Sequence, residues 1–463
     1  MYRIHICECA EKDTEGFEGM GLTMRISSAK RAAAALSAMA LVGSLSACGG
    51  DDGKSSDSSK PLEVWSRSAP DPAKTYEAIL AAFTQKTGIK VDYQGVIEFD
   101  TQLQARASSK DLPDVWINDA GLLGSYQSQG YVTKVEKGDI AGSDQITDET
   151  WAQNQGLDGA TYGVPFSRQS FATVVRSDWR KKLGLPVPKT WDELAALANA
   201  FATKDPDGNG KADTYGMVVP GSSKRGYIGW WASSYIWQAG GDIVEKSGDT
   251  KYKSVINSPQ TKTALEWVRK QFCTPGNVVP GSLNLTTSDT PFFGEGTAGI
   301  YLTGPYTFSG YDKAPGKDKY EVIPMPKGPV GTTTLAEGEN IYFGAGSDKT
   351  AEQKALAEFL ISPDAQKIGM APDGAAQPVV RLPVNKTLDA GAVRNDPRWK
   401  LVQDEYTANS KAFVWSINFQ PIRQALGEGI NKMMSSCSSD LDAGLKSLDQ
   451  AINAELKSQD LAE

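Results

Sequence analysis

The chain has 463 residues, a formal net charge of −8, and an aromatic content that includes eleven Trp and sixteen Tyr. This moderately acidic balance argues against nucleic acid as a partner, because proteins that bind nucleic acids carry a basic footprint. The one histidine, His5, lies in a segment that we expect to be absent from the mature protein. The mature chain then has no imidazole for Ser-His-Asp or Cys-His chemistry, or for an imidazole-based zinc site.

The N-terminal segment carries the pattern of a lipoprotein export signal. Basic residues at Arg25, Lys30 and Arg31 precede a small apolar run at 32–43 and the sequence LSAC, which ends at Cys48. The apolar run is too short to cross a bilayer, which needs about 20 residues, and a small-residue exit is typical of signal peptides. The alternative is a buried core helix with an incidental cysteine.

This pattern predicts how the N-terminal region is divided. We expect residues 1–23 to be an upstream mis-start, residues 24–47 to be the signal peptide, and Cys48 to carry the lipid. Cleavage before Cys48 removes 47 of the 463 residues and leaves 416, enough for two or three domains. Residues 48–60 are rich in Gly, Asp, Ser and Lys, so they predict a flexible tether.

Strand and helix patterns alternate at the start of the folded body. A strand pattern occupies 62–65, and Asp71 followed by Pro72 predicts an N-cap and a first helical position. Apolar residues at helical spacing continue to Gly88, where the helix is expected to end. A strand at 89–93, a helix at 99–108 and a strand at 113–117 follow. This succession predicts a parallel α/β sheet.

Later segments are mainly helical. Thr190 and Glu193 have the spacing of a capping box, which predicts a helix that runs to Phe201. Further helices are predicted at 230–238, 261–272, 351–360, 422–434 and 441–456. Cys273 and Cys437 are the remaining cysteines of the mature chain, and they form either one disulfide in an oxidising compartment or two separate buried thiols.

Aromatic and polar residues at strand ends suggest a sugar ligand. The apolar face of a pyranose stacks on aromatic rings, while polar groups hydrogen-bond its hydroxyls. Trp65 and Arg67 follow the first predicted strand, and Asn118 and Asp119 follow the third. Ligands of open parallel sheets bind at these carboxyl ends of strands. For any single aromatic residue, the alternative to a role in sugar binding is a place in the hydrophobic core.

From about Leu62 to the C-terminus, the chain resembles the family 1 extracellular solute-binding proteins of ABC importers, the sugar-binding family that includes maltose-binding protein. The resemblance is carried by motifs in order and by paired C-terminal helices. These motifs are YGVPF at 162–166, VVRSD at 174–178, GLP at 184–186, PKTWDEL at 188–194, FGEGTAGI at 293–300, GPY at 304–306, AEFL at 357–360, SP at 362–363 and LPV at 382–384.

The resemblance implies an α/β, two-lobed periplasmic-binding-protein fold of type II, with the ligand cleft between the lobes and a helical C-terminal part. Lobe 1 would span 61–165 and about 338–370, and lobe 2 about 166–337 and 371–463. The chain would cross between lobes near 165–169, 337–341 and 371–383. The function implied is binding rather than catalysis, without a required cofactor. The protein would be a monomer that a lipid anchors outside the cell. It would close around a sugar and present it to the permease subunits in the membrane.

The resemblance also implies which residues bind the sugar. The aromatic candidates are Trp65, Trp230 or its neighbour Trp231, Tyr306 and Phe419. The polar candidates are Arg67, Asn118, Asp119, Arg168, Gln169 and Glu339. Tyr306 stands where the family more often has Trp, and Gln169 where maltose-binding protein has a carboxylate. Arg67 and Arg168 suit an acidic sugar, but arginines also bond neutral hydroxyls, so we expect a neutral one.

Two other classes stay open at this point. A secreted glycosidase needs two carboxylates and no histidine, and Asp119 and Glu339 would be its candidates. A polysaccharide-binding surface protein would bind its ligand without closing over it. Discrimination between these classes and the importer component requires a test of turnover and of ligand-induced closure.

Residues 205–213 copy the first nine positions of an EF-hand calcium loop. The candidate calcium ligands are Asp205, Asp207, Asn209, Lys211 and Asp213. Position 12, which supplies a bidentate carboxylate in this motif, is Gly216. The sequence therefore predicts either a structural calcium site completed by another oxygen or a solvated turn.

Overall fold

The computed structural model describes residues 60–288, 291–374 and 376–463. The predicted signal peptide, Cys48 and all of the predicted tether except Lys60 lie outside these ranges. No helix of the described residues combines the length and apolar character that spanning a bilayer requires.

The larger sheet has seven strands in the order β12-β4-β11-β3-β1-β2, with β13 paired to β11. The predicted parallel arrangement is confirmed, since β1 runs parallel to both β2 and β3. Strand β11 runs antiparallel to β3 and β4 and therefore brings a distant segment into the centre. The strands are β1 Leu62–Ser66, β2 Val91–Gly95, β3 Val115–Asp119, β4 Val164–Ser170, β11 Thr334–Phe343, β12 Leu382–Pro383 and β13 Ser410–Lys411.

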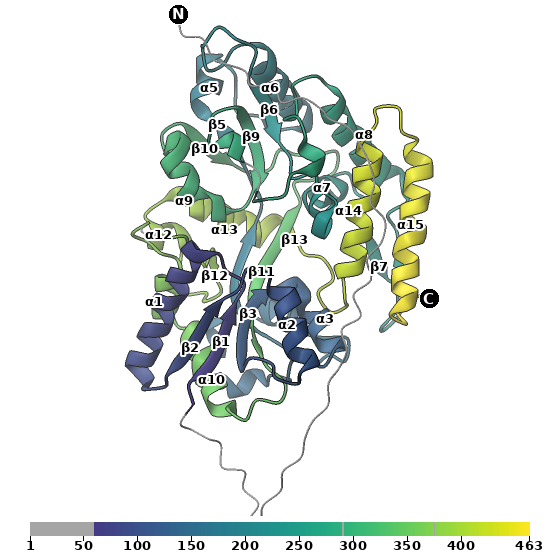
Figure 1. Ribbon diagram of the computed structural model, residues 1–463. Coiled ribbons are helices and arrows are strands. Elements are labelled where there is room, and N and C mark those ends of the chain that lie inside the picture. Colours follow the sequence, from purple (N-terminus) through teal and green to yellow (C-terminus); the bar gives the residue numbers. More distant parts are fainter. Residues whose placement is uncertain (1–59, 289–290, 375) are drawn as a thin grey trace, which may run out of the picture. The chain divides into compact units, whose positions relative to one another are not determined.

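The smaller sheet has four strands in the order β10-β5-β9-β6. Its strands are β5 Ala172–Arg176, β6 Tyr215–Val218, β9 Ala298–Thr303 and β10 Tyr320–Ile323, and a separate hairpin pairs β7 Val244–Lys246 with β8 Tyr252–Ser254. Only Phe171 separates β4 from β5, so the chain passes there directly from the larger sheet to the smaller. Figure 1 shows β1, β2, β3 and β12 grouped together and β5, β9 and β10 grouped apart from them.

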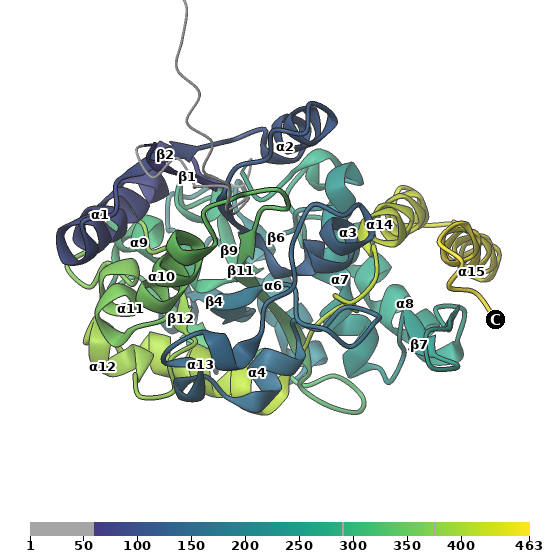
Figure 2. The ribbon, with the colours of Figure 1, turned by 90° about the horizontal axis from the view of Figure 1, so that it is seen from below.

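Helices cover both sheets. They are α1 Pro70–Thr87, α2 Phe99–Ser108, α3 Leu123–Ser128, α4 Asp148–Ala152, α5 Ser177–Lys182, α6 Trp191–Thr203, α7 Tyr227–Gln238, α8 Pro259–Cys273, α9 Phe308–Tyr311, α10 Thr350–Leu360, α11 Pro363–Gly369, α12 Ala390–Arg394, α13 Pro397–Asn409, α14 Gln420–Met434 and α15 Leu441–Ser458. Figures 1 and 2 agree that α14 and α15 lie side by side.

Local sequence signals explain where the helices begin and end. The capping box at Thr190 and Glu193 is present at the start of α6. Gly88 ends α1 with a φ of 77°, a conformation that glycine adopts without strain. The predicted N-cap at Asp71 is wrong, because Pro70 takes the first helical position and Asp71 falls within the first turn. A carboxylate is favourable there too, because the helix dipole is positive at that end.

One covalent link joins elements that are distant in sequence. Cys273, the last residue of α8, forms a disulfide with Cys437 in the connection between α14 and α15. The two residues are 164 positions apart. This bond ties the C-terminal helix pair to α8. The sequence left open whether the two cysteines form a disulfide or stay separate thiols, and the structure has the disulfide.

Candidate ligand cleft

A cavity of about 350 Å³ opens where residues of the two sheets face each other, and we call it the cleft. From the larger sheet it receives Arg67, which follows β1, together with Asp119 at the end of β3. Tyr306, which follows β9 of the smaller sheet, and Trp230 of α7 contribute aromatic rings. The remaining polar lining comes from Ser167, Gln169, Arg225, Tyr227, Thr287, Ser288, Glu337, Glu339, Gln377, Arg381 and Arg423.

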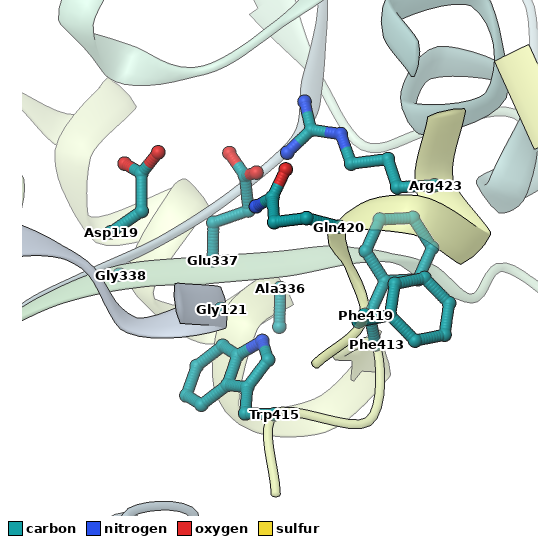
Figure 3. A pocket seen from close by; sticks show the side chains of 10 residues that line it. All are labelled: Asp119, Gly121, Ala336, Glu337, Gly338, Phe413, Trp415, Phe419, Gln420 and Arg423. Carbon is teal, nitrogen blue, oxygen red and sulfur yellow. The ribbon is translucent and has the colours of Figure 1, made fainter. Parts of the chain in front are cut away.

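Beside the cleft lies a smaller aromatic recess, shown in Figure 3. Phe413, Trp415 and Phe419 line it, and Phe413 and Phe419 stack with their ring centroids 4.8 Å apart. Its volume of about 30 Å³ is room for a water molecule and not for a sugar ring. The recess shares Asp119 and Glu337 with the cleft, so it forms part of the same wall.

Asp119 is held by a fixed polar network. Arg67 donates to its Oδ1 at 2.7 Å, and the Nε of Arg67 donates to Asn118 Oδ1 at 3.1 Å. Asn118 in turn donates to the Tyr126 hydroxyl at 2.7 Å. Burial raises the pKa of Asp119, but the nearby Arg67, Arg225 and other arginines outweigh this and keep the pKa below its ordinary value. Asp119 therefore stays a charged acceptor.

The two glutamates of β11 have different partners. Glu339 accepts from Arg381 at 2.5 Å and from the Tyr76 hydroxyl at 3.0 Å. Glu337 accepts from the Trp230 indole N–H and from Gln169 Nε2, the latter at 3.1 Å. Burial raises the pKa of Glu337. One glutamate is thus neutralised by an ion pair, while the other is bonded by uncharged donors.

Residues 68–367 match the model of the bacterial extracellular solute-binding proteins. The chain belongs to this family. The family and the fold inferred from the motifs are therefore confirmed, and this is a family of binding proteins rather than of enzymes.

Individual members of the family are similar over parts of the chain. Lipoprotein LipO of Bacillus subtilis is 41% identical over 92 residues, 19% of this chain and 18% of LipO. The polygalacturonan/rhamnogalacturonan-binding protein YtcQ of the same organism is 32% identical over 225 residues, 45% of this chain and 43% of YtcQ. The matched region thus spans less than half the length of these relatives.

A solved structure of low sequence identity shows the same fold. The GacH receptor of Streptomyces glaucescens, known unliganded and with acarbose, superposes with a TM-score of 0.73 at 16% identity. The alignment covers 87% of this chain and 99% of the receptor.

The structure brings most of the predicted family site together. Of the predicted residues, the cleft is lined by Arg67, Asp119, Gln169, Trp230, Tyr306 and Glu339. Phe419 lines the adjoining recess, where its ring is 3% exposed and stacks on Phe413. Asn118 lies behind Arg67 and orients it.

Three predicted residues lie away from the cleft. Trp65 is 3% exposed, packs on Phe99 in a core cluster and donates to Glu63. Trp231 is 1% exposed in the core beside α7, because successive helical residues point about 100° apart. Arg168 is buried and bonds the Glu339 carbonyl and Asn340. Their roles are in packing or support.

Several cleft residues were not among the predicted ones. Glu337 could have been found, because residues two apart on a strand share a face and Glu339 was already a candidate. Arg423 lies one helical turn after Phe419 and could have been inferred in the same way. Arg225 and Arg381 lie in irregular segments, and no periodicity marks them.

The candidate calcium loop lies between α6 and β6, away from the cleft. Its Asp205 carboxylate accepts backbone N–H groups of Gly208, Asn209 and Gly210. The Asn209 side chain donates to both Asp207 and Asp213. Within the described ranges, no group of three or more His, Cys, Asp or Glu side chains is placed to hold a metal ion. Calcium binding stays a prediction.

Proposed function

We propose that the chain is the extracytoplasmic substrate-binding component of an ABC importer, which captures an oligosaccharide in the cleft and delivers it to the permease. The observation that carries the proposal is the cleft itself, whose lining combines Trp230 and Tyr306 with many hydrogen-bonding side chains. Its volume of about 350 Å³ falls in the usual range of small-molecule sites. YtcQ and GacH, which are named for polysaccharide and acarbose ligands, support a carbohydrate.

Closure of the cleft would follow from its construction. Its wall combines Arg67 and Asp119 of the larger sheet with Tyr306 of the smaller one, so a sugar held there contacts both. A ligand shifts a conformational equilibrium only by the difference in its affinity for the two states. The closed state, which makes contacts on both sides, is therefore the one that the sugar stabilises.

The position outside the membrane is part of the same proposal. Cys48 would carry the lipid, and residues 48–60 would set the reach of the folded body above the bilayer. The family is extracellular, and the relative LipO is a lipoprotein. The partner would be the permease, which receives the closed, sugar-loaded form of a monomer.

A binding panel with the full chain tests this proposal. Neutral and acidic mono- and oligosaccharides are screened by thermal shift, and each hit is titrated by calorimetry. We expect stoichiometric binding, a smaller radius of gyration in small-angle scattering, and loss of binding in Trp230→Ala. A peptide or polyamine that stabilises the protein while no sugar does so would contradict the carbohydrate assignment.

The same samples separate binding from hydrolysis. A glycosidase needs a carboxylic acid with a raised pKa as its general acid. The pKa of Asp119 is instead held low, and Glu339 is ion-paired with Arg381. Neither residue suits that role. Product formation from a bound oligosaccharide, lost on Asp119→Asn or Glu339→Gln, would replace the importer proposal with a hydrolase.

A further inference from the structure

The charged side chains of the cleft are unequally paired. Four arginines and three carboxylates line it among the described residues, namely Arg67, Arg225, Arg381, Arg423, Asp119, Glu337 and Glu339. Two close ion pairs, Arg67 with Asp119 at 2.7 Å and Arg381 with Glu339 at 2.5 Å, account for four of them. Arg225 is paired more loosely, with Asp100 outside the cleft lining and with Asp119, while Arg423 and Glu337 have no ion pair within 4 Å among the described residues.

Arg423 is the least satisfied of these arginines. Its Nε is buried without a hydrogen-bond partner, and its guanidinium forms no ion pair with any carboxylate of the described residues. Figure 3 shows the side chain extending from the first turn of α14 towards Glu337 and the cavity. The side chain is half-buried, Glu337 is its nearest opposing charge in effect but lies beyond ion-pair distance, and burial lowers the pKa of Arg423.

Arg225 lies next to Arg423 and is only loosely paired. Its Nη2 is 3.5 Å from Asp100 and 3.9 Å from Asp119. Its φ of 52° lies in the left-handed region, which is a strained conformation for a residue with a side chain. The neighbouring Gly226 packs so tightly on α14 that a Cβ there would lie 2.2 Å from the Arg423 carbonyl oxygen. The fold thus holds two like charges side by side at the cleft.

The surrounding backbone adds to this positive potential. Helices α7 and α14, which begin at Tyr227 and Gln420, have their N-caps at Gly226 beside the cleft and at Phe419 in the recess, and no side chain caps them. Uncapped helix N-termini favour anions, because their free N–H groups and the helix dipole are positive. The single remaining acid, Glu337, has its pKa raised by burial and so opposes the arginines less than an ordinary carboxylate.

From these observations we infer that the cleft takes an acidic sugar, and that Arg423 with Arg225 binds its carboxylate. The inference rests on the proposed function and names the ligand class within it: a uronic acid or an oligosaccharide that contains one. A guanidinium forms short, paired hydrogen bonds to a carboxylate, and these discriminate strongly against a neutral analogue. Trp230 and Tyr306 remain available for the sugar rings. This proposal differs from the neutral sugar that we expected from the sequence.

The test compares sugars that differ only in charge. The full chain is titrated by calorimetry with di- and trigalacturonate, with diglucuronate, with the methyl esters of all three, and with neutral galactobiose and maltotriose. We expect at least one acid to bind about 10- to 100-fold more tightly than its own methyl ester, since a hydrogen bond to a charged group contributes this much. Raising the salt concentration should narrow that difference.

Matched variants assign the preference to the arginines. Arg423→Gln should remove most of the preference for the acid over its own ester. Arg225→Gln should reduce the preference partly. Lys224→Gln removes an exposed positive charge from the same segment without lining the cleft, and it should change nothing.

Each outcome decides the matter. Equal or tighter binding of the esters or the neutral sugars overturns the acidic-sugar inference and leaves the importer proposal standing. Binding of no carbohydrate, acidic or neutral, overturns both. A preference for the acid that survives in folded Arg423→Gln and Arg225→Gln overturns the assignment to these side chains. The wild-type comparison of acid and ester needs no variant, so a misfolded mutant does not block the test.

Discussion

At the scale of single residues, neighbours in sequence take opposite roles. Trp230 lines the cleft, whereas Trp231 is a core residue. Arg67, just after β1, reaches the cleft, whereas Trp65 within the strand packs in a core cluster. Residue type and position in the sequence were enough to select these residues as candidates. Whether a side chain points into the cleft or into the core depends on the element against which its own helix or strand packs.

Glu337 gives the cleft a pH-sensitive group. It faces Trp230, Gln169, Asp119 and Arg423, and burial raises its pKa above the ordinary 4.5. A raised carboxyl pKa means that the folded state holds the proton more tightly than the unfolded state. The stabilising effect is complete below pH 4.5 and is lost as the pH rises through the raised pKa.

We therefore predict that Glu337→Gln removes a decrease in stability that the wild type shows on going from about pH 4.5 towards neutral pH. The measurement is the free energy of unfolding from urea titrations at several pH values. Glu149→Gln, at an exposed carboxylate, is the control and should keep the wild-type slope. An unchanged slope in Glu337→Gln would contradict the role of burial here.

At the scale of elements, an ionic cluster fastens the start of α13. Asp396 caps the helix by accepting the Arg398 N–H at 3.1 Å and also pairs with the Arg398 guanidinium. Arg398 pairs in addition with Asp312, 2.7 Å away, in the segment between α9 and β10. Burial raises the pKa of Asp396, but Arg398 and Lys317 outweigh this and lower it to about 2. The cluster thus joins α13 to the connection that leads into the smaller sheet.

For this cluster we predict that Asp396→Asn lowers the free energy of unfolding at pH 7 by about 1–3 kcal/mol, from the lost cap and charged hydrogen bonds. The contribution of the wild-type carboxylate is present above its ordinary pKa of 3.8 and is lost as the pH falls through about 2. The variant should therefore lose less stability over that acidic range. Asp404→Asn, at an exposed pair within α13, should cost little. Equal losses in both variants would count against the cluster.

The disulfide between Cys273 and Cys437 belongs to the same scale. It closes a separation of 164 residues and lies outside the cleft lining. We expect the double substitution to serine, or reduction, to lower the free energy of unfolding by about 2–5 kcal/mol. Sugar affinity should stay within about twofold, as calorimetry on the folded variant can show. A folded variant that no longer binds sugar would contradict this expectation. It would mean that the bond between α8 and the C-terminal helices is needed to hold the cleft residues in place.

At the scale of the whole molecule, attachment and binding are separate functions of separate segments. Cys48 precedes the described residues, whereas every cleft residue lies at Arg67 or later. The cleft itself is assembled from segments that are hundreds of residues apart, from Arg67 to Arg423. The proposed anchor would therefore affect location, while the fold between the sheets would determine affinity.

The corresponding prediction is that Cys48→Ala moves the protein from the membrane fraction to the medium or soluble fraction, with unchanged affinity for its sugar. Immunoblots of fractionated cells report location, and calorimetry on the released protein reports affinity. A folded, released variant that binds no sugar would contradict the separation. Retention in the membrane fraction would contradict Cys48 as the site of lipid attachment.

The sequence by itself determined the family, the alternation of strands and helices, and the approximate bounds of eight of the fifteen described α-helices. These properties follow from local signals, such as the capping box at Thr190, the glycine at Gly88, and apolar spacing, which act within a few residues. It also identified six cleft residues through the family resemblance, whereas Glu337 was missed.

Only the tertiary structure decided which charges in the cleft are compensated. From the sequence, Arg67 and Arg423 are both simply arginines near predicted site residues. In the structure, Arg67 has Asp119 at 2.7 Å, whereas Arg423 has no ion pair within the described residues. That difference depends on distances between β3, α7 and α14, which chain order does not specify. It is the physical reason why we expected a neutral sugar from the sequence but propose an acidic one from the structure.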